Sequence, residues 1–163
     1  LQIVKSEVTA TKFMIKVIQK NAQSAQIEVS GNVDEDFRPE DVPAIESAEI
    51  VFDLKELKSL NSCGIRSWIT MLETQMAAKK IVYQNCPAIM IQQINLVQGL
   101  LPQSGQIQSF MAPYFCEKCD KEYSIFINTK DISGNKAPAA KCPADASEME
   151  FDAIEKQFFS FLK

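Results

Sequence analysis

Three cysteines and one aspartate in the C-terminal third of the chain have the types and spacing of a metal site. Cys116 and Cys119 are separated by two residues, and Cys142 starts a second stretch in which Asp145 is the fourth residue. Two thiolates on one tight turn supply half of a tetrahedral site, and a carboxylate oxygen is also an acceptable zinc ligand. These four residues therefore predict a structural Zn²⁺ site, in which metal binding supplies folding free energy to a small segment.

Two other interpretations of these cysteines are open at the level of the sequence. The segment can be metal-free and held by its strands alone, or Cys116 and Cys119 can form a redox pair. A redox pair of the thioredoxin type lies between a strand and a helix, and that placement is absent here. In zinc ribbons the second half-site commonly reads Cys-Pro-x-Cys-Gly. Residues 142–146 (Cys-Pro-Ala-Asp-Ala) resemble it, with Asp145 in place of the second cysteine.

A second candidate site is the polar turn Asn61-Ser62-Cys63-Gly64, which opens a predicted helix. The helix is indicated by apolar residues at spacings of three and four, namely Ile65, Trp68, Ile69, Leu72 and Met76. Asn61 or Ser62 can cap it, because a short side-chain oxygen accepts hydrogen bonds from first-turn N–H groups. Cys63 is a potential nucleophile, but no histidine exists to act as its base. We therefore predict that Cys63 is a partly buried structural thiol, and Cys86 likewise.

The composition argues against catalysis. The chain contains no histidine, which excludes Ser-His-Asp catalysis, Cys-His catalysis and any His-ligated metal site. No Gly-rich phosphate loop and no paired-carboxylate arrangement stands out either. We therefore predict that this protein is not an enzyme.

The hydrophobic pattern predicts an α/β fold over residues 1–103. Strands are expected at residues 13–18, 26–30, 50–54 and 80–83, one helical turn at 39–42, and amphipathic helices at about 62–76 and 87–101. The first two strands form a predicted hairpin that ends at Gly31. Strands that alternate with helices indicate a mixed β-sheet with helices packed on it, mostly through right-handed crossovers.

Residues 104–163 predict a small β-rich extension that carries the cysteines and ends in a helix. Residues 106–110 and 123–127 alternate like strands on either side of the Cys116–Cys119 pair. The closing helix is expected over residues 153–162, with four large apolar residues on one face: Ile154, Phe158, Phe161 and Leu162. We expect this helix to dock on the first domain, and a groove on a partner protein is the alternative.

The order of these segments resembles that of STAS domains, the family of anti-sigma factor antagonists. Residues 50–54 (Ile-Val-Phe-Asp-Leu) and then 60–65 (Leu-Asn-Ser-Cys-Gly-Ile) are similar to the family's apolar strand ending in Asp-Leu and its helix-opening Asp-Ser-Ser/Thr-Gly-Leu. Residues 31–34 (Gly-Asn-Val-Asp) resemble the Gly-x-Leu/Val-Asp that ends the preceding strand in the family. The resemblance covers about residues 8–103. Asn61 stands in place of the usual Asp, and Cys63 in place of Ser or Thr.

The resemblance implies a regulatory function by partner switching. In such systems an anti-sigma factor kinase phosphorylates the serine, and the unphosphorylated domain binds the kinase and releases the sigma factor. In this chain the implied phosphoacceptor is Ser62, with Asp34, Asn61, Cys63 and Gly64 as its neighbours. A phosphate there would meet free N–H groups at the helix N-terminus, while its charge would repel a kinase surface. The alternatives are that Ser62 only caps the helix of a non-phosphorylated scaffold, or that the domain senses a small ligand such as a nucleotide or lipid.

Charge and hydropathy restrict the partners. The formal net charge is −4 and the pI is near 5.0, with scattered basic residues, so nucleic acid is not an expected partner. No run of about 18 apolar residues predicts a membrane span, and residues 1–5 lack a secretory pattern. The five cysteines are an odd and sparse set, which favours a reducing compartment, the cytoplasm, over a secreted disulfide framework. We therefore expect a cytoplasmic protein with a protein partner.

Overall fold

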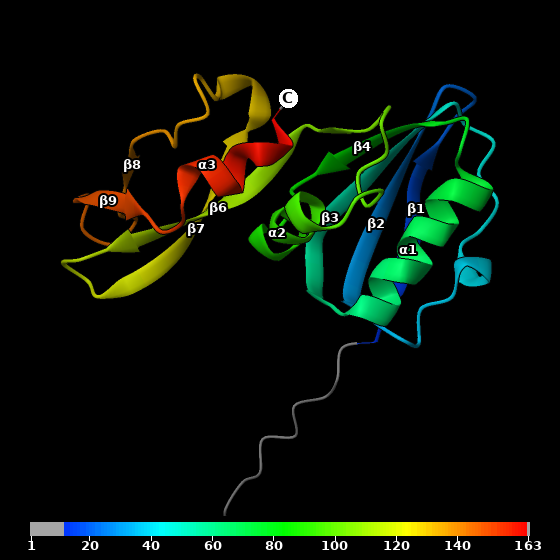
Figure 1. Ribbon diagram of the computed structural model, residues 1–163, viewed down its shortest axis with the longest axis horizontal. Helices are drawn as coiled ribbons and strands as arrows, with labels where there is room; N and C mark the ends of the chain where they lie inside the picture. Colours follow the sequence, from blue (N-terminus) through cyan, green and yellow to red (C-terminus); the bar gives the residue numbers. More distant parts are fainter. Residues whose placement is uncertain (1–11, 163) are drawn as a thin grey trace, which may run out of the picture.

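The computed structural model describes residues 12–162, which form two β-sheets joined in series (Figure 1). Residues 1–11, at the start of the predicted first domain, lie outside the described residues. The first sheet has five strands in the order β1-β2-β3-β4-β5, and the second has four in the order β7-β6-β9-β8. The predicted fold class is confirmed: a mixed sheet with helices packed on it, followed by a β-rich, cysteine-bearing extension.

The first sheet contains one antiparallel and three parallel strand pairs. The β1–β2 hairpin supplies the antiparallel pair, as the sequence predicts, and β2 to β5 run parallel to one another. The strands are β1 (Met14–Lys20), β2 (Ser24–Val33), β3 (Glu49–Leu60), β4 (Lys80–Gln84) and β5 (Gln106–Ile107). Residues 106–110 do not form one strand, because Gln106–Ile107 pairs with β4 and the chain enters the second sheet at Ser109.

The helices of the first sheet lie on one of its faces. The chain passes from β2 to β3, β4 and β5 in the order in which these strands stand in the sheet. Parallel connections are almost always right-handed crossovers, so connections that advance in one direction fall on the same face. Figure 1 shows α1 (Ser62–Gln75) and α2 (Ala88–Leu96) together on that face, with the one-turn helix η1 (Pro39–Asp41) beside α1.

The core of the first sheet lies beneath these helices. Along β2 every second residue is buried, from Ala25 through Ile27 and Val29, while the residues between them are half-buried. This alternation is expected of a sheet with one covered face. Trp68 of α1 fills the centre: its ring packs against Phe52, and its indole N–H donates to the Tyr83 hydroxyl at 2.9 Å. Tyr83 in turn donates to the Leu100 carbonyl oxygen at 2.7 Å, so these buried polar groups are all paired.

The strand pairs of the second sheet, β6–β7, β6–β9 and β8–β9, are antiparallel. Its strands are β6 (Ser109–Cys116), β7 (Lys121–Asn128), β8 (Ala140–Lys141) and β9 (Glu148–Phe151), with the 3-10 turn η2 (Thr129–Asp131) after β7. β6 and β7 form a long hairpin whose turn contains Cys119. Figure 1 shows that this turn lies at the end of the second sheet remote from the first.

The predicted helix over residues 153–162 is wrong in its extent. Only α3 (Glu155–Phe158) and the 3-10 turn η3 (Phe159–Phe161) are helical. Ile154 does not join a packed face and is 63% exposed, whereas Phe158 and Phe159 are buried around Phe110 of β6. Packing of several aromatic rings around one another, rather than a regular apolar stripe, determines the backbone here.

The C-terminal segment with α3 docks on the part of the molecule that contains the first sheet, as predicted, and it does so through α2. α2 is shorter than the predicted 87–101, because it ends at Leu96 and the chain turns at Gly99, which has a φ of +93°. Asn95 of α2 donates from its amide to the carbonyl oxygens of Gln157 at 3.0 Å and Phe158 at 2.9 Å. Within residues 12–162, none of the helices combines the length and the apolar character that a membrane crossing requires.

Candidate functional site

The structure brings the predicted metal ligands together at the remote end of the second sheet. Cys116 ends β6, Cys119 lies in the β6–β7 turn, and Cys142 and Asp145 lie in the turn between β8 and β9. One ligand atom from each of the four residues lies within 4.8 Å of the others. Two hairpin turns, separated by more than twenty residues of sequence, therefore face each other across one small volume.

Both turns have the same backbone feature after their second candidate ligand. Asp120, which follows Cys119, has a φ of +53°, and Ala146, which follows Asp145, has a φ of +59°. A left-handed residue at this place bends the chain sharply enough for both ligands of a turn to point to one side. In the second turn the Ala146 N–H donates to the Cys142 carbonyl oxygen at 2.9 Å. Asp145 thus occupies the position of a second ligand in the backbone as well as in the sequence.

The distances within the cluster fit a tetrahedral metal. With metal–sulfur bonds of about 2.3 Å and metal–oxygen bonds of about 2.0 Å, ligand atoms stand about 3.8 Å apart for two sulfurs and about 3.5 Å for sulfur and oxygen. The Sγ atoms of Cys119 and Cys142 are 3.6 Å apart, and Cys119 Sγ is 3.4 Å from Asp145 Oδ2. Cys116 Sγ is 4.0 Å from Asp145 Oδ1. The four side chains therefore lie close enough together to hold a metal ion such as Zn²⁺.

Ser147 contacts two of the four candidate ligands. Its hydroxyl donates to Asp145 Oδ1 at 2.5 Å, and its backbone N–H donates to the same oxygen at 2.9 Å. These bonds lower the pKa of Asp145 well below its ordinary value, because they stabilise the carboxylate. The Ser147 Oγ also lies 3.2 Å from Cys116 Sγ, and because its single proton goes to Asp145, the thiol is the donor in this contact.

The other two thiols are embedded in hydrogen bonds of a different kind. The Cys119 pKa rises to about 12, mainly because of its hydrogen bond with Cys142 and then because of burial. The Ala144 N–H donates to Cys142 Sγ at 3.4 Å, a backbone contact suited to a thiolate ligand. The cluster has four protein ligands, so a tetrahedral ion bound there would have no open position for a substrate. The four residues could therefore hold a metal ion with all of its positions filled by the protein.

The second predicted site, around Ser62, lies at the N-terminus of α1. The cap of α1 is Asn61, whose side-chain oxygen accepts from the Gly64 N–H at 2.9 Å. Ser62 is the first helical residue and is exposed, so the interpretation of Ser62 as the cap is wrong. The Asn61 amide also donates to Glu35 Oε2 at 2.7 Å, and this bond, after a backbone hydrogen bond, lowers the Glu35 pKa. Asp34 faces its own loop and accepts from the Asp36 N–H at 3.1 Å.

Gly64 allows β2 and α1 to approach each other closely. A Cβ atom at this position would lie 1.9 Å from the Val33 carbonyl oxygen and 2.6 Å from the Asp34 backbone nitrogen. The Asn61 N–H donates to the same Val33 carbonyl at 3.1 Å. The end of β2 is therefore held against the first turn of α1 through backbone atoms, which requires a glycine at residue 64.

Cys63 and Cys86 differ in exposure. Cys63, expected to be partly buried, is exposed because it lies on the outward side of the first turn of α1. Cys86 is buried as expected, and burial raises the pKa of its thiol. No disulfide is formed by the five cysteines, all of which lie within the described residues.

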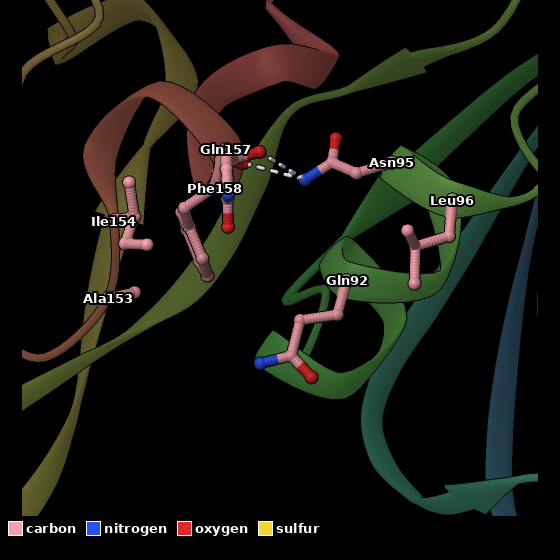
Figure 2. Close-up of a pocket in the computed structure, with 7 residues that line it drawn as sticks. All are labelled: Gln92, Asn95, Leu96, Ala153, Ile154, Gln157 and Phe158. Atoms are coloured by element: carbon pink, nitrogen blue, oxygen red, sulfur yellow. Dashed lines mark hydrogen bonds between the residues drawn. The ribbon is translucent and has the colours of Figure 1, made fainter.

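An open groove runs between α1 and α2 and begins at Ser62. Its volume is about 520 Å³. Its floor and walls include the apolar side chains of Leu60, Ile69 and Val97, with Arg66 and Glu73 supplying opposite charges. A smaller hollow of about 180 Å³ lies at the junction of α2 and α3 (Figure 2). It is smaller than usual small-ligand sites, and the two hydrogen bonds of Asn95 run along one edge of it.

The comparisons with known proteins add no relative: no protein-family description matches the chain, and no curated protein is similar to it. The interpretation of the cysteine–aspartate cluster and of the α1 surface therefore depends only on the geometry described above.

Sequence reasoning missed two parts of the metal cluster. Ser147 was not among the predicted site residues, although an Asp-x-Ser sequence commonly forms a turn in which the carboxylate accepts from the N–H two residues on. The left-handed residues Asp120 and Ala146 were also missed, because zinc-ribbon turns usually have glycine there and this chain has other residues.

Proposed function

We propose that this protein is a non-catalytic regulatory module that binds a protein partner through the N-terminal half of α1 and the groove beside it. The observation that carries the proposal is the position of Ser62, an exposed hydroxyl on the first residue of α1 at the end of the α1–α2 groove. Asn61 performs the capping, so Ser62 is not needed for that structural task. A serine in this place is well suited to modification and to contact with a partner.

In its finer form the proposal is a STAS-type anti-sigma factor antagonist that switches partners when Ser62 is phosphorylated. The support is the motif order together with the close packing of residues 31–34 against the first turn of α1. A phosphate on Ser62 would lie at the positive end of the α1 dipole, which favours negative charge. The unmodified surface would bind an anti-sigma factor kinase, and the added charge would repel it.

The charges near Ser62 support a switch in which the phosphorylated and unphosphorylated forms bind the partner with different affinity. Arg66 is four residues after Ser62 and lines the same groove, so it can pair with a phosphate on the same helical face. The Glu35 carboxylate accepts a hydrogen bond from the amide of the neighbouring Asn61, and its negative charge would oppose that phosphate. Phosphorylation would therefore reorganise the charge of this surface without unfolding α1.

We further propose that the ion held by Cys116, Cys119, Cys142 and Asp145 is Zn²⁺, with a structural role. Three thiolates favour zinc over magnesium or calcium, which prefer oxygen ligands. The free cysteines fit a reducing compartment, so we place the protein in the cytoplasm. Native and denaturing mass spectrometry of chelator-free protein test the metal. A mass excess of one zinc ion in the native spectrum alone is expected, and its absence contradicts the assignment.

A small-ligand sensor is the second candidate function, because the α1–α2 groove has the volume of a ligand site. Small-molecule sites usually measure about 300–1,000 Å³ and are mostly apolar with a few polar groups. The groove, at about 520 Å³ and with Gln93 and Thr70 among apolar residues, falls in that range. Recovery of a co-purified nucleotide or lipid in native mass spectra would favour this function over partner binding.

Partner binding is tested by capture from the native cell with variants of the α1 surface. Thr70→Arg places a bulky charge in the groove, and Thr74→Arg makes the same change one turn further along α1, outside the groove. We expect wild type and Thr74→Arg to capture the same partner, Thr70→Arg to lose it, and Ser62→Glu to bind it at least tenfold more weakly. Equal capture by all four proteins contradicts the proposed surface.

A further inference from the structure

The metal cluster contains a polar residue that the ligand pattern does not include. Ser147 makes two hydrogen bonds to one carboxylate oxygen of Asp145, from its hydroxyl at 2.5 Å and from its backbone N–H at 2.9 Å. The same hydroxyl oxygen is 3.2 Å from Cys116 Sγ. Ser147 thus lies between two candidate ligands that come from different hairpin turns.

The two carboxylate oxygens of Asp145 have different neighbours. Oδ1 accepts both hydrogen bonds from Ser147, which uses its lone-pair directions. Oδ2 lies 3.4 Å from Cys119 Sγ, close to the separation of about 3.5 Å that a sulfur and an oxygen bound to one zinc ion would have. Oδ1 is 4.0 Å from Cys116 Sγ, further than that separation. Oδ2 is therefore the oxygen at the distance from Cys119 that a shared ion requires, while Ser147 engages Oδ1.

We propose that Ser147 is the positioning residue of the metal site, which holds Asp145 so that Oδ2 alone binds the ion. This inference rests on the metal site proposed above. An aspartate side chain is longer than a cysteine and has one more rotatable bond, and its carboxylate can bind through one oxygen or two. Fixing Oδ1 by two hydrogen bonds removes that freedom before the metal arrives, which lowers the entropic cost of binding. Groups that orient a ligand in this way commonly contribute 10- to 100-fold in metal affinity.

The position of Ser147 also explains how an aspartate can stand where a cysteine is usual. The Ser147 N–H bond belongs to the backbone of the turn and is kept whatever the side chain. The hydroxyl bond depends on the side chain alone. Ser147→Ala therefore removes only the hydroxyl contribution, and Ser147→Thr keeps it.

The experiment is a Co²⁺ and Zn²⁺ titration of the purified full chain in a metal-buffered solution. We expect Ser147→Ala to weaken the affinity about 10- to 100-fold, with a changed Co²⁺ visible spectrum, because the carboxylate can then rotate. Ser147→Thr should restore both the affinity and the spectrum. Ser124→Ala, at an exposed serine of β7, is the matched control and should bind as wild type. A Ser147→Ala affinity within twofold of wild type overturns the inference.

A double-mutant cycle separates an effect through Asp145 from an effect through Cys116. In an Asp145→Ala background, Ser147→Ala should have little further effect on the affinity, because the carboxylate that it orients is gone. If Ser147→Ala weakens binding as much in that background as in wild type, Ser147 does not act through Asp145 and the inference is wrong. Lack of metal binding by wild type overturns both the metal site and this inference. Binding by wild type without the Ser147 effect overturns this inference alone.

Discussion

The two ends of the molecule are held together by different kinds of interaction. The first sheet closes over a continuous core in which Trp68, Phe52 and Tyr83 pack together and every polar atom of the Trp68–Tyr83 pair is hydrogen-bonded. The remote end of the second sheet has a small cluster of cysteines and one aspartate instead. Between them, Phe110 and Phe158 form an aromatic contact that ties the second sheet to α3.

If an ion occupies the candidate site, only one end of this molecule depends on something outside the chain. A core of large apolar side chains is stabilised by burial from water, whatever else is bound. The turn regions of the second sheet bury few large side chains, so with the proposed metal site their order would depend on ligand bonds to an ion. The predictions below test whether the two ends respond separately, from the largest expected effect to the smallest.

Metal removal should affect the remote end strongly and the first sheet hardly at all. We expect a chelator to expose amides of residues 116–121 and 142–147 to hydrogen exchange, because structural zinc sites contribute about 10–16 kcal/mol of apparent binding free energy. Thiol labelling gives a second measurement. Exposed Cys63 should react in the metal-bound protein, three more thiols after chelation, and buried Cys86 only after unfolding. Rapid labelling of four thiols before chelation contradicts the presence of a metal.

Gly64→Ala should be the most damaging single substitution in the first sheet. The new Cβ would lie 1.9 Å from the Val33 carbonyl oxygen, and both the strand and the helix would have to move. We expect a loss of about 3 kcal/mol in the free energy of unfolding, measured by denaturant titration. Co²⁺ affinity, measured on the folded variant, should stay at the wild-type value. A parallel loss of metal affinity would show that the two ends are coupled.

Tyr83→Phe should lower stability by a smaller amount, again in the first sheet only. The substitution leaves the Trp68 N–H and the Leu100 carbonyl oxygen without their partner in a buried place. Unpaired buried polar groups cost about 1–3 kcal/mol. Tyr114→Phe is the matched change in the second sheet, where the lost bond is to the Pro138 carbonyl oxygen and is only partly buried. Its smaller cost should appear in hydrogen exchange of β6, not of β4.

The sequence predicted the first sheet better than the second for a physical reason. Its strands and helices have strong hydrophobic periodicity, so their type and order follow from the pattern. The hydrophobic pattern failed to predict short segments whose structure depends on a few specific contacts. It did not show that Gln106–Ile107 belongs to the first sheet, nor that packing around Phe110 shortens the closing helix. At α1 it left the choice between Asn61 and Ser62 open, which only the cap geometry decides.

At the metal cluster, the sequence predicted the ligand types and not the residues that position them. Cysteines at a spacing of two residues are recognisable because metal chemistry restricts the side chain. Ser147 positions Asp145 through a hydroxyl hydrogen bond, and serines are common in turns without this role. Asp120 and Ala146 contribute only through their left-handed backbone conformation. Hydrogen bonds and dihedral angles of this kind depend on how two distant turns meet, which no local pattern determines.

Ala146→Gly should be a small change that strengthens the remote end and leaves the first sheet as it is. Ala146 has a φ of +59°, where a side chain costs about 1 kcal/mol relative to glycine. Glycine relieves this strain only when the turn is formed, so the gain should appear as a metal affinity about fivefold higher in Co²⁺ titrations. Ala144→Gly is the control, because residue 144 has no positive φ and glycine there only adds freedom to the unfolded turn. Equal affinities for the two variants would mean that the left-handed turn does not limit metal binding, and the cluster would then be limited by its aspartate ligand instead.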